Sequence, residues 1–140
     1  MDRKIILGAW RLSEWYMEDK SGDVYHPFGK EVDGFIMYTS DYYMSANIVA
    51  LSRKNCISEG VGLESLHQGK GSYLSYSGSY TLYKDRVIHH VKVSLIPEWI
   101  NNDQERFYKI QDNKLIINSF TEKSDKTVFK HTLVWEKCCN

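Results

Sequence analysis

The sequence predicts an all-β protein, a single antiparallel up-and-down β-barrel of about eight strands with a central cavity and at most one or two short helices. Apolar and polar residues alternate with a period of two along most of the chain, as in strands that bury one face. Short polar segments separate these runs, as hairpin turns would. Tyr occurs ten times and Pro only twice, which favours β structure. Closure into a barrel is expected because it removes exposed sheet edges, and a β-sandwich is the alternative.

The longest alternating stretch, Tyr73 to Trp99, predicts one long β-hairpin with its turn at Tyr83 to Arg86. Gly78 lies inside the first strand, where glycine indicates a bend at which the sheet curls. The residues expected to face the barrel interior are Leu74, Tyr76, Gly78, Tyr80 and Leu82 on the first strand and Val87, His89, Val91, Val93 and Leu95 on the second. Polar groups on such a face must find partners in the protein, in water or in a ligand.

The chain before this hairpin predicts three further strands. They are expected at Ile5 to Glu18, Asp33 to Thr39 and Tyr43 to Leu51. A polar turn at Asp19 to Asp23 ends the first of them. The segment Val24 to Gly29 contains Pro27, which disfavours helix and removes a ladder hydrogen bond, so an extended edge or crossing segment is expected there.

The alternation fails over residues 52–71, which contain four glycines. We expect a loop with a short helix at Leu63 to Gln68. It is either a lid or binding loop across one mouth of the barrel, or a solvated connection. After a turn at Pro97 to Asp103, three strands are expected at Glu105 to Gln111, Lys114 to Phe120 and Val128 to Glu136. A chain of 140 residues with this pattern predicts one domain, residues 1–140.

Charge and cysteine content narrow the partners that we expect. The 18 basic and 18 acidic side chains cancel, so no overall field favours nucleic acid. No apolar run approaches the length that crosses a membrane or forms a signal-peptide core, so no membrane partner and a cytoplasmic location are expected. Cys56, Cys138 and Cys139 have neither the count nor the spacing of a disulfide framework or a zinc site, and we expect plain thiols.

Polar side chains on the predicted inward faces are the candidate site. By alternation they are Glu14, Tyr16, Tyr38, Tyr76, Tyr80, His89, Tyr108 and His131. His89 with Tyr76 or Tyr80 is the candidate catalytic group, because hairpin pairing brings them together and imidazole titrates near neutrality. The alternative is a neutral core histidine satisfied by a tyrosine hydroxyl. The other residues, together with Trp99, are expected to bind the ligand. His90 is expected to face outward, so no metal site and no cofactor are expected.

Two roles are open for Arg106. It could stack on Trp10 and cover one end of the barrel through a cation–π contact. It could instead point into the cavity and bind a ligand carboxylate or enolate.

An ordered series of short motifs resembles the lipocalin-like domain family over nearly the whole chain. The matching blocks are Gly8-Ala9-Trp10-Arg11-Leu12, Pro27-Phe28-Gly29, Gly34 with Tyr38, Met44-Ser45-Ala46, Tyr76-Ser77-Gly78-Ser79-Tyr80, His89-His90-Val91, Pro97-Glu98-Trp99, Arg106 and Val134-Trp135. The resemblance implies a calycin-type barrel with a central cavity, its floor closed by the Trp of Gly8-Ala9-Trp10. It also implies a link to bacterial and fungal secondary-metabolite pathways, in which some similar small barrels are cyclases or isomerases. The glycine-rich 52–71 segment and the Cys138-Cys139 tail depart from the family pattern.

Three functions are consistent with these observations. The favoured one is a cofactor-independent cyclase or isomerase of secondary-metabolite biosynthesis that folds a small, mostly apolar organic substrate and polarises one carbonyl. A carrier with the same cavity and no turnover is the alternative. An interaction module with a fully packed interior is the third, because eight strands can be filled by their own side chains.

Overall fold

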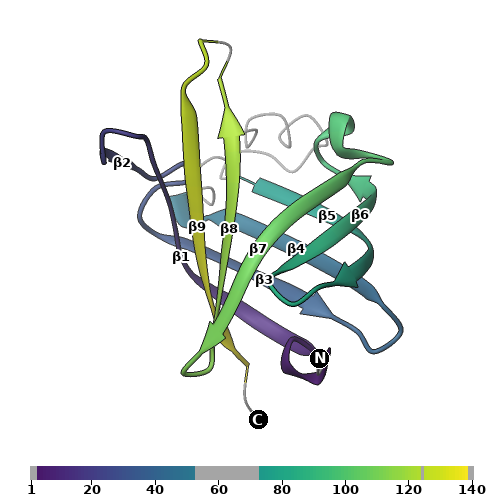
Figure 1. Ribbon diagram of the computed structural model, residues 1–140. Coiled ribbons are helices and arrows are strands. Elements are labelled where there is room, and N and C mark those ends of the chain that lie inside the picture. The colour runs from purple at the N-terminus through teal and green to yellow at the C-terminus, as the bar shows by residue number, and fades with distance from the viewer. Residues whose placement is uncertain (1–2, 53–72, 124, 139–140) are drawn as a thin grey trace, which may run out of the picture.

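The computed structural model describes residues 3–52, 73–123 and 125–138, and these residues form nine antiparallel strands. The strands are β1 (Gly8–Glu18), β2 (Val24–Tyr25), β3 (Val32–Tyr38), β4 (Tyr43–Ala50), β5 (Tyr73–Leu82), β6 (Arg86–Ser94), β7 (Asp103–Gln111), β8 (Lys114–Glu122) and β9 (Val128–Lys137). Except for β2, each pairs with the next barrel strand along the chain, and β1 also pairs with β9. Eight strands therefore close into the predicted barrel, and β2 is a short addition beside β1 (Figure 1).

A 3-10 helix, η1 (Arg3–Ile5), precedes the first barrel strand and includes Ile5, where the sequence predicted that this strand begins. Ile6 follows it and is fully buried, and the Trp10 indole nitrogen donates to the Ile6 carbonyl oxygen at 3.0 Å. The chain therefore turns inward before β1 begins at Gly8, and the expectation of a strand from Ile5 is wrong. Figure 1 shows this end, marked N, opposite the segment that carries another 3-10 helix, η3 (Pro97–Trp99).

The cation that covers Trp10 is Lys137. Its ammonium nitrogen lies 4.7 Å from the Trp10 ring centroid and also donates to the Leu7 carbonyl oxygen. Arg106 instead lies over Trp99, with its guanidinium carbon 5.5 Å from that ring. The predicted pairing of Trp10 with Arg106 is therefore wrong, and the second role considered for Arg106, inside the cavity, becomes the relevant one.

A bulge in β1 reverses which residues face inward along its second half. Against β9, Leu12 pairs with Trp135 and Glu14 with Val134, so Ser13 is an extra residue with no residue of β9 paired opposite it. One inserted residue exchanges the two faces of everything beyond it. Glu14 is accordingly exposed, Trp15 turns inward, and the predicted inward orientation of Glu14 is wrong.

A second bulge lies at Gly78, where the sequence predicted a bend. Ser77 pairs with Val93 and Gly78 with Val91, so Lys92 is the extra residue on β6. Beyond it Val93 is 61% exposed, and its predicted inward orientation is wrong. The strands approach closely here, because a Cβ on Gly78 would lie 1.9 Å from the His90 carbonyl oxygen. Glycine is thus required by contact with the neighbouring strand.

Two further sequence expectations concern the 52–71 loop and membrane-spanning segments. The expected helix at Leu63 to Gln68 lies outside the described residues, as does nearly all of the 52–71 loop. Within the described residues, no helix is both long and apolar enough to cross a membrane.

The core at the closed end consists of large, fully buried side chains, Trp10, Trp135, Tyr38, Ile36 and Leu115. Free space is left further along the barrel.

Candidate functional site

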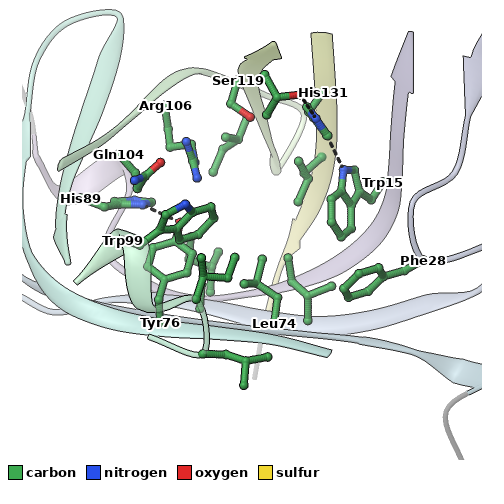
Figure 2. A pocket seen from close by; sticks show the side chains of 18 of the residues that line it. Trp15, Phe28, Leu74, Tyr76, His89, Trp99, Gln104, Arg106, Ser119 and His131 are labelled. Atoms are coloured by element: carbon green, nitrogen blue, oxygen red, sulfur yellow. Dashed lines mark hydrogen bonds between the residues drawn. The ribbon is translucent and has the colours of Figure 1, made fainter. Parts of the chain in front are cut away.

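The barrel contains a cavity of about 610 Å³, within the size range of small-molecule sites. Its wall is mostly aliphatic and aromatic. His89, Tyr76, Gln104 and Arg106 lie at one end, His131 lies near Trp15 at the other, and Ser119 lies between Arg106 and His131 (Figure 2). The cavity therefore has a mostly apolar wall, with polar side chains at both ends.

His89 is the centre of the first polar end and is completely buried. Its Nε2 lies 2.7 Å from the Tyr38 hydroxyl oxygen and its Nδ1 lies 2.8 Å from the Tyr76 hydroxyl oxygen. The three groups come from β6, β3 and β5, so the barrel closure itself holds the imidazole between two phenols. Tyr76 and His89 line the cavity, whereas Tyr38 lies behind His89 and does not.

Burial keeps both His89 and Tyr38 uncharged. It lowers the pKa of His89 well below its usual value, and the positive charge of Arg106 lowers this pKa further. Burial also raises the pKa of Tyr38 well above that of a free phenol. Near neutral pH a neutral imidazole therefore lines this end of the cavity, with the neutral Tyr38 phenol behind it, and Arg106 supplies the positive charge.

Among the described residues that line the cavity, Arg106 carries a positive charge and Glu98 a negative charge. Trp99 packs edge-on against Tyr76, with ring centroids 5.2 Å apart, and Arg106 lies over the same indole. The stacking places the guanidinium beside the aromatic wall, and Figure 2 shows it pointing down toward the cavity near Gln104. A ligand oxygen at this end would meet a cation in apolar surroundings, where electrostatic interactions are stronger than in water.

His131 organises the other end of the cavity. Trp15 donates its indole N–H to the His131 Nδ1 at 3.1 Å, and Thr121 Oγ1 lies 3.0 Å from Nε2. Burial, followed by Arg106, lowers the pKa of His131. The neutral imidazole must then carry its proton on Nε2, because Nδ1 is the acceptor from Trp15.

The structure brings together half of the residues that the sequence singled out. Tyr76, His89, Trp99, Arg106 and His131 line the cavity. The remaining predicted residues do not line it: Glu14, Tyr16, Tyr38, Tyr80 and Tyr108. Tyr80 pairs with His89 across the hairpin, as predicted, but its hydroxyl donates to the Thr39 carbonyl oxygen at 2.8 Å. The Tyr108 hydroxyl donates to the Tyr83 carbonyl oxygen at 2.9 Å.

Several lining residues were missed by the sequence reasoning. Trp15 was assigned outward because the bulge at Ser13 carries no local signal. Phe28, which follows Pro27, packs on Trp15 with centroids 4.7 Å apart. Glu98 lies in η3, and the position of this helix at the cavity reveals it. Gln104 lies on β7 two residues before Arg106, so alternation along that strand gives both the same face.

The buried His89 predicts a specific loss of stability in acid. Its pKa is lowered in the folded state, so the unfolded chain binds more protons below about pH 6.5. As the pH decreases below this value, protonation of this group should lower the free energy of unfolding by roughly 1.4 kcal/mol per pH unit, until the pH reaches the pKa of His89 in the folded state. Urea unfolding at pH 8, 6.5 and 5 measures the slope.

His89→Gln is the matched variant, because glutamine can hydrogen-bond to the tyrosines but does not titrate. We expect it to be less stable than the native protein at pH 8 and to have a flatter pH profile. Equal slopes in the two proteins would show that His89 is not the group held neutral by folding.

The described residues contain no group of three or more His, Cys, Asp or Glu side chains placed to hold a metal ion. Cys138 is an exposed free thiol. The candidate site therefore consists of the cavity wall and its two polar ends.

Comparison with known proteins agrees with this architecture. A family model described as a lipocalin-like domain matches residues 7–138, almost the whole chain. A comparison with curated proteins gives no match. The family is one of small-molecule-binding barrels, and the closed barrel and its internal cavity fit it. This chain belongs to the lipocalin-like domain family.

Proposed function

We propose that the protein is a cofactor-independent isomerase or cyclase acting on a small, mostly apolar metabolite that carries a carbonyl group. The observation that supports this most directly is that Tyr76 and Arg106 line the same end of an apolar cavity, where both contact Trp99. A hydrogen-bond donor and a cation placed together stabilise the negative charge that develops on a carbonyl oxygen during proton transfer or ring closure.

An isomerisation at this site balances without a cofactor. In a β,γ-unsaturated carbonyl compound the α C–H bond breaks and its proton passes to a base, while the electron pair forms a dienolate with its negative charge on the oxygen. A proton then returns at the γ-carbon, and the double bond becomes conjugated with the carbonyl. Tyr76 and Arg106 hold the oxygen. Glu98, the acidic side chain of the described lining, is the proposed acceptor and donor of the moving proton. In a cyclisation, the aromatic wall would hold a flexible chain in its reactive conformer.

A carrier without turnover is the second candidate. Both ring nitrogens of His89 are already hydrogen-bonded to tyrosines, so the imidazole offers no free lone pair to a substrate. A buried histidine whose two ring nitrogens are both hydrogen-bonded makes the cavity wall rigid, which suits a binding site without turnover. In this function the same cavity and the same polar end would fix the orientation of the ligand.

The test uses 1-(2-naphthyl)but-3-en-1-one, an apolar ketone that can isomerise to its conjugated form with a change in ultraviolet absorbance. Trp15, Trp99 and Trp135 line the cavity, so ligand entry should quench tryptophan emission. We expect saturable quenching and conjugation faster than in buffer. Quenching without acceleration would favour the carrier, and no quenching by this ketone would argue against an accessible cavity.

A further inference from the structure

The hydrogen bonds along Tyr38, His89 and Tyr76 have a direction that the geometry determines. A neutral imidazole donates from one nitrogen and accepts at the other. One tyrosine must therefore donate to His89 and the other must accept from it, at oxygen–nitrogen distances of 2.7 and 2.8 Å. The two possible directions differ in which tyrosine keeps a hydroxyl hydrogen for another acceptor.

The direction with the proton on Nε2 leaves the Tyr38 hydrogen unused. Tyr38 is 2% exposed and does not line the cavity. Among the described residues, His89 is the hydrogen-bond partner of its hydroxyl, and its ring lies nearly perpendicular to that of Tyr80, with 5.0 Å between the centroids. A buried hydroxyl hydrogen without an acceptor is unfavourable, and the penalty makes this direction roughly tenfold or more less populated.

The opposite direction gives the Tyr38 hydroxyl hydrogen an acceptor and leaves the unused hydrogen at the cavity. Tyr38 then donates to Nε2, and Nδ1–H donates to the Tyr76 oxygen. The hydrogen left over is that of Tyr76, whose side chain lines the cavity and can meet a ligand or water there. Arg106, at the same end, is a donor without any acceptor function.

We propose that Tyr38 fixes the direction of this chain, so that Tyr76 presents a hydrogen-bond donor to the cavity and the bound ligand must carry an acceptor oxygen there. The ligand class is then an apolar molecule with a carbonyl or carboxylate oxygen at the Arg106 end. Molecules with only a donor at that end would face two donors, Tyr76 and Arg106, and would depend on the amide oxygen of Gln104 as acceptor, so they are disfavoured. This inference rests on the cavity of the proposed function and specifies its ligand chemistry. Tyr38 acts through His89 and is a positioning residue.

Nuclear magnetic resonance of protein labelled with ¹⁵N-histidine tests the direction without any ligand. The chain has five histidines, and the His89 signals are identified by their loss in His89→Gln. We expect the native protein to carry the His89 proton on Nδ1. Tyr38→Phe removes the donor to Nε2 and should shift His89 toward the Nε2–H form. Tyr80→Phe is the matched control, because it removes a buried hydroxyl that bonds to the Thr39 carbonyl instead. A native Nε2–H form would overturn the proposal.

The ligand class is tested with 2-acetylnaphthalene and 2-ethylnaphthalene, which differ mainly in the carbonyl oxygen. By titration calorimetry we expect the native protein and Tyr80→Phe to bind the ketone roughly three- to tenfold more tightly. Tyr38→Phe should lose much of this preference, although Tyr38 does not line the cavity. Equal affinities in the native protein would overturn the acceptor requirement. If neither compound binds, the proposed function fails, and the native ¹⁵N spectrum still decides the direction by itself.

Discussion

Gly78→Ala is expected to destabilise the barrel by about 3 kcal/mol or more. The new Cβ would lie 1.9 Å from the His90 carbonyl oxygen and 2.8 Å from its carbonyl carbon. Both are backbone atoms that cannot rotate away, so β5 and β6 would have to separate at the bulge. Thermal unfolding should show a midpoint lowered by roughly 10 °C, using the usual conversion for domains of this size.

Ser79→Ala is the control, because Ser79 is the next residue of β5 and its substitution adds no atom near the β6 backbone. Its unfolding midpoint should stay close to that of the native protein. Alanine normally stabilises a strand relative to glycine, since glycine loses more conformational freedom on folding. An unchanged or raised midpoint for Gly78→Ala would therefore show that the two strands are not in close contact at this position.

Tyr76→Phe is expected to slow conjugation of 1-(2-naphthyl)but-3-en-1-one by roughly 10² to 10⁴-fold, the usual contribution of a positioned acid or donor. The phenyl ring still fills the wall beside Trp99, so affinity measured by tryptophan quenching should change far less than the rate. The interaction is used mainly in the transition state, when negative charge reaches the oxygen.

Tyr80→Phe separates this effect from general damage to the barrel. Its ring is equally buried, but its hydroxyl is bonded to the Thr39 carbonyl and does not reach the cavity. We expect this variant to retain most of the native rate. Equal losses in the two variants would assign the effect to packing, and a native rate in Tyr76→Phe would remove the hydroxyl from the chemistry.

The barrel could be predicted because its determinants are local. Alternation in each run and the polar turns between runs gave eight strands, and their antiparallel order follows from short connections. The N-terminal turn could not be predicted in this way. The aliphatic residues from Ile5 to Leu7 suit a strand, whereas in the structure Ile6 is buried and its carbonyl accepts from the indole of Trp10, contacts that no local pattern indicates.

The errors in the candidate site come mainly from the bulges. Counting alternate residues places Glu14 inside and Trp15 outside, and the single extra residue at Ser13 reverses both. Gly78 did signal an irregularity, but glycine does not show which strand carries the extra residue. The side facing the cavity beyond a bulge thus depends on pairing with a distant strand.

Whether a contact within the site could be predicted depended on how far apart its residues lie in the sequence. The hairpin correctly brought tyrosines next to His89, because β5 and β6 are adjacent in sequence. Choosing Tyr76 over Tyr80 as the hydroxyl partner requires the bulged register. Tyr38, which is hydrogen-bonded to the other ring nitrogen of His89, lies 51 residues away in the sequence, and no local pattern indicates that contact.

Closure of the barrel through β1 and β9 also determines when the protein can fold. The ladder joins the two ends of the domain, and the Ser13 hydroxyl donates to the Val134 carbonyl across 121 residues of chain. During synthesis β1 must wait, with one edge unpaired, until the last strand has left the ribosome. Long-range contacts of this kind make folding slow, on the scale of milliseconds to seconds. The nascent chain is therefore most exposed to edge-to-edge aggregation just before its final strand emerges.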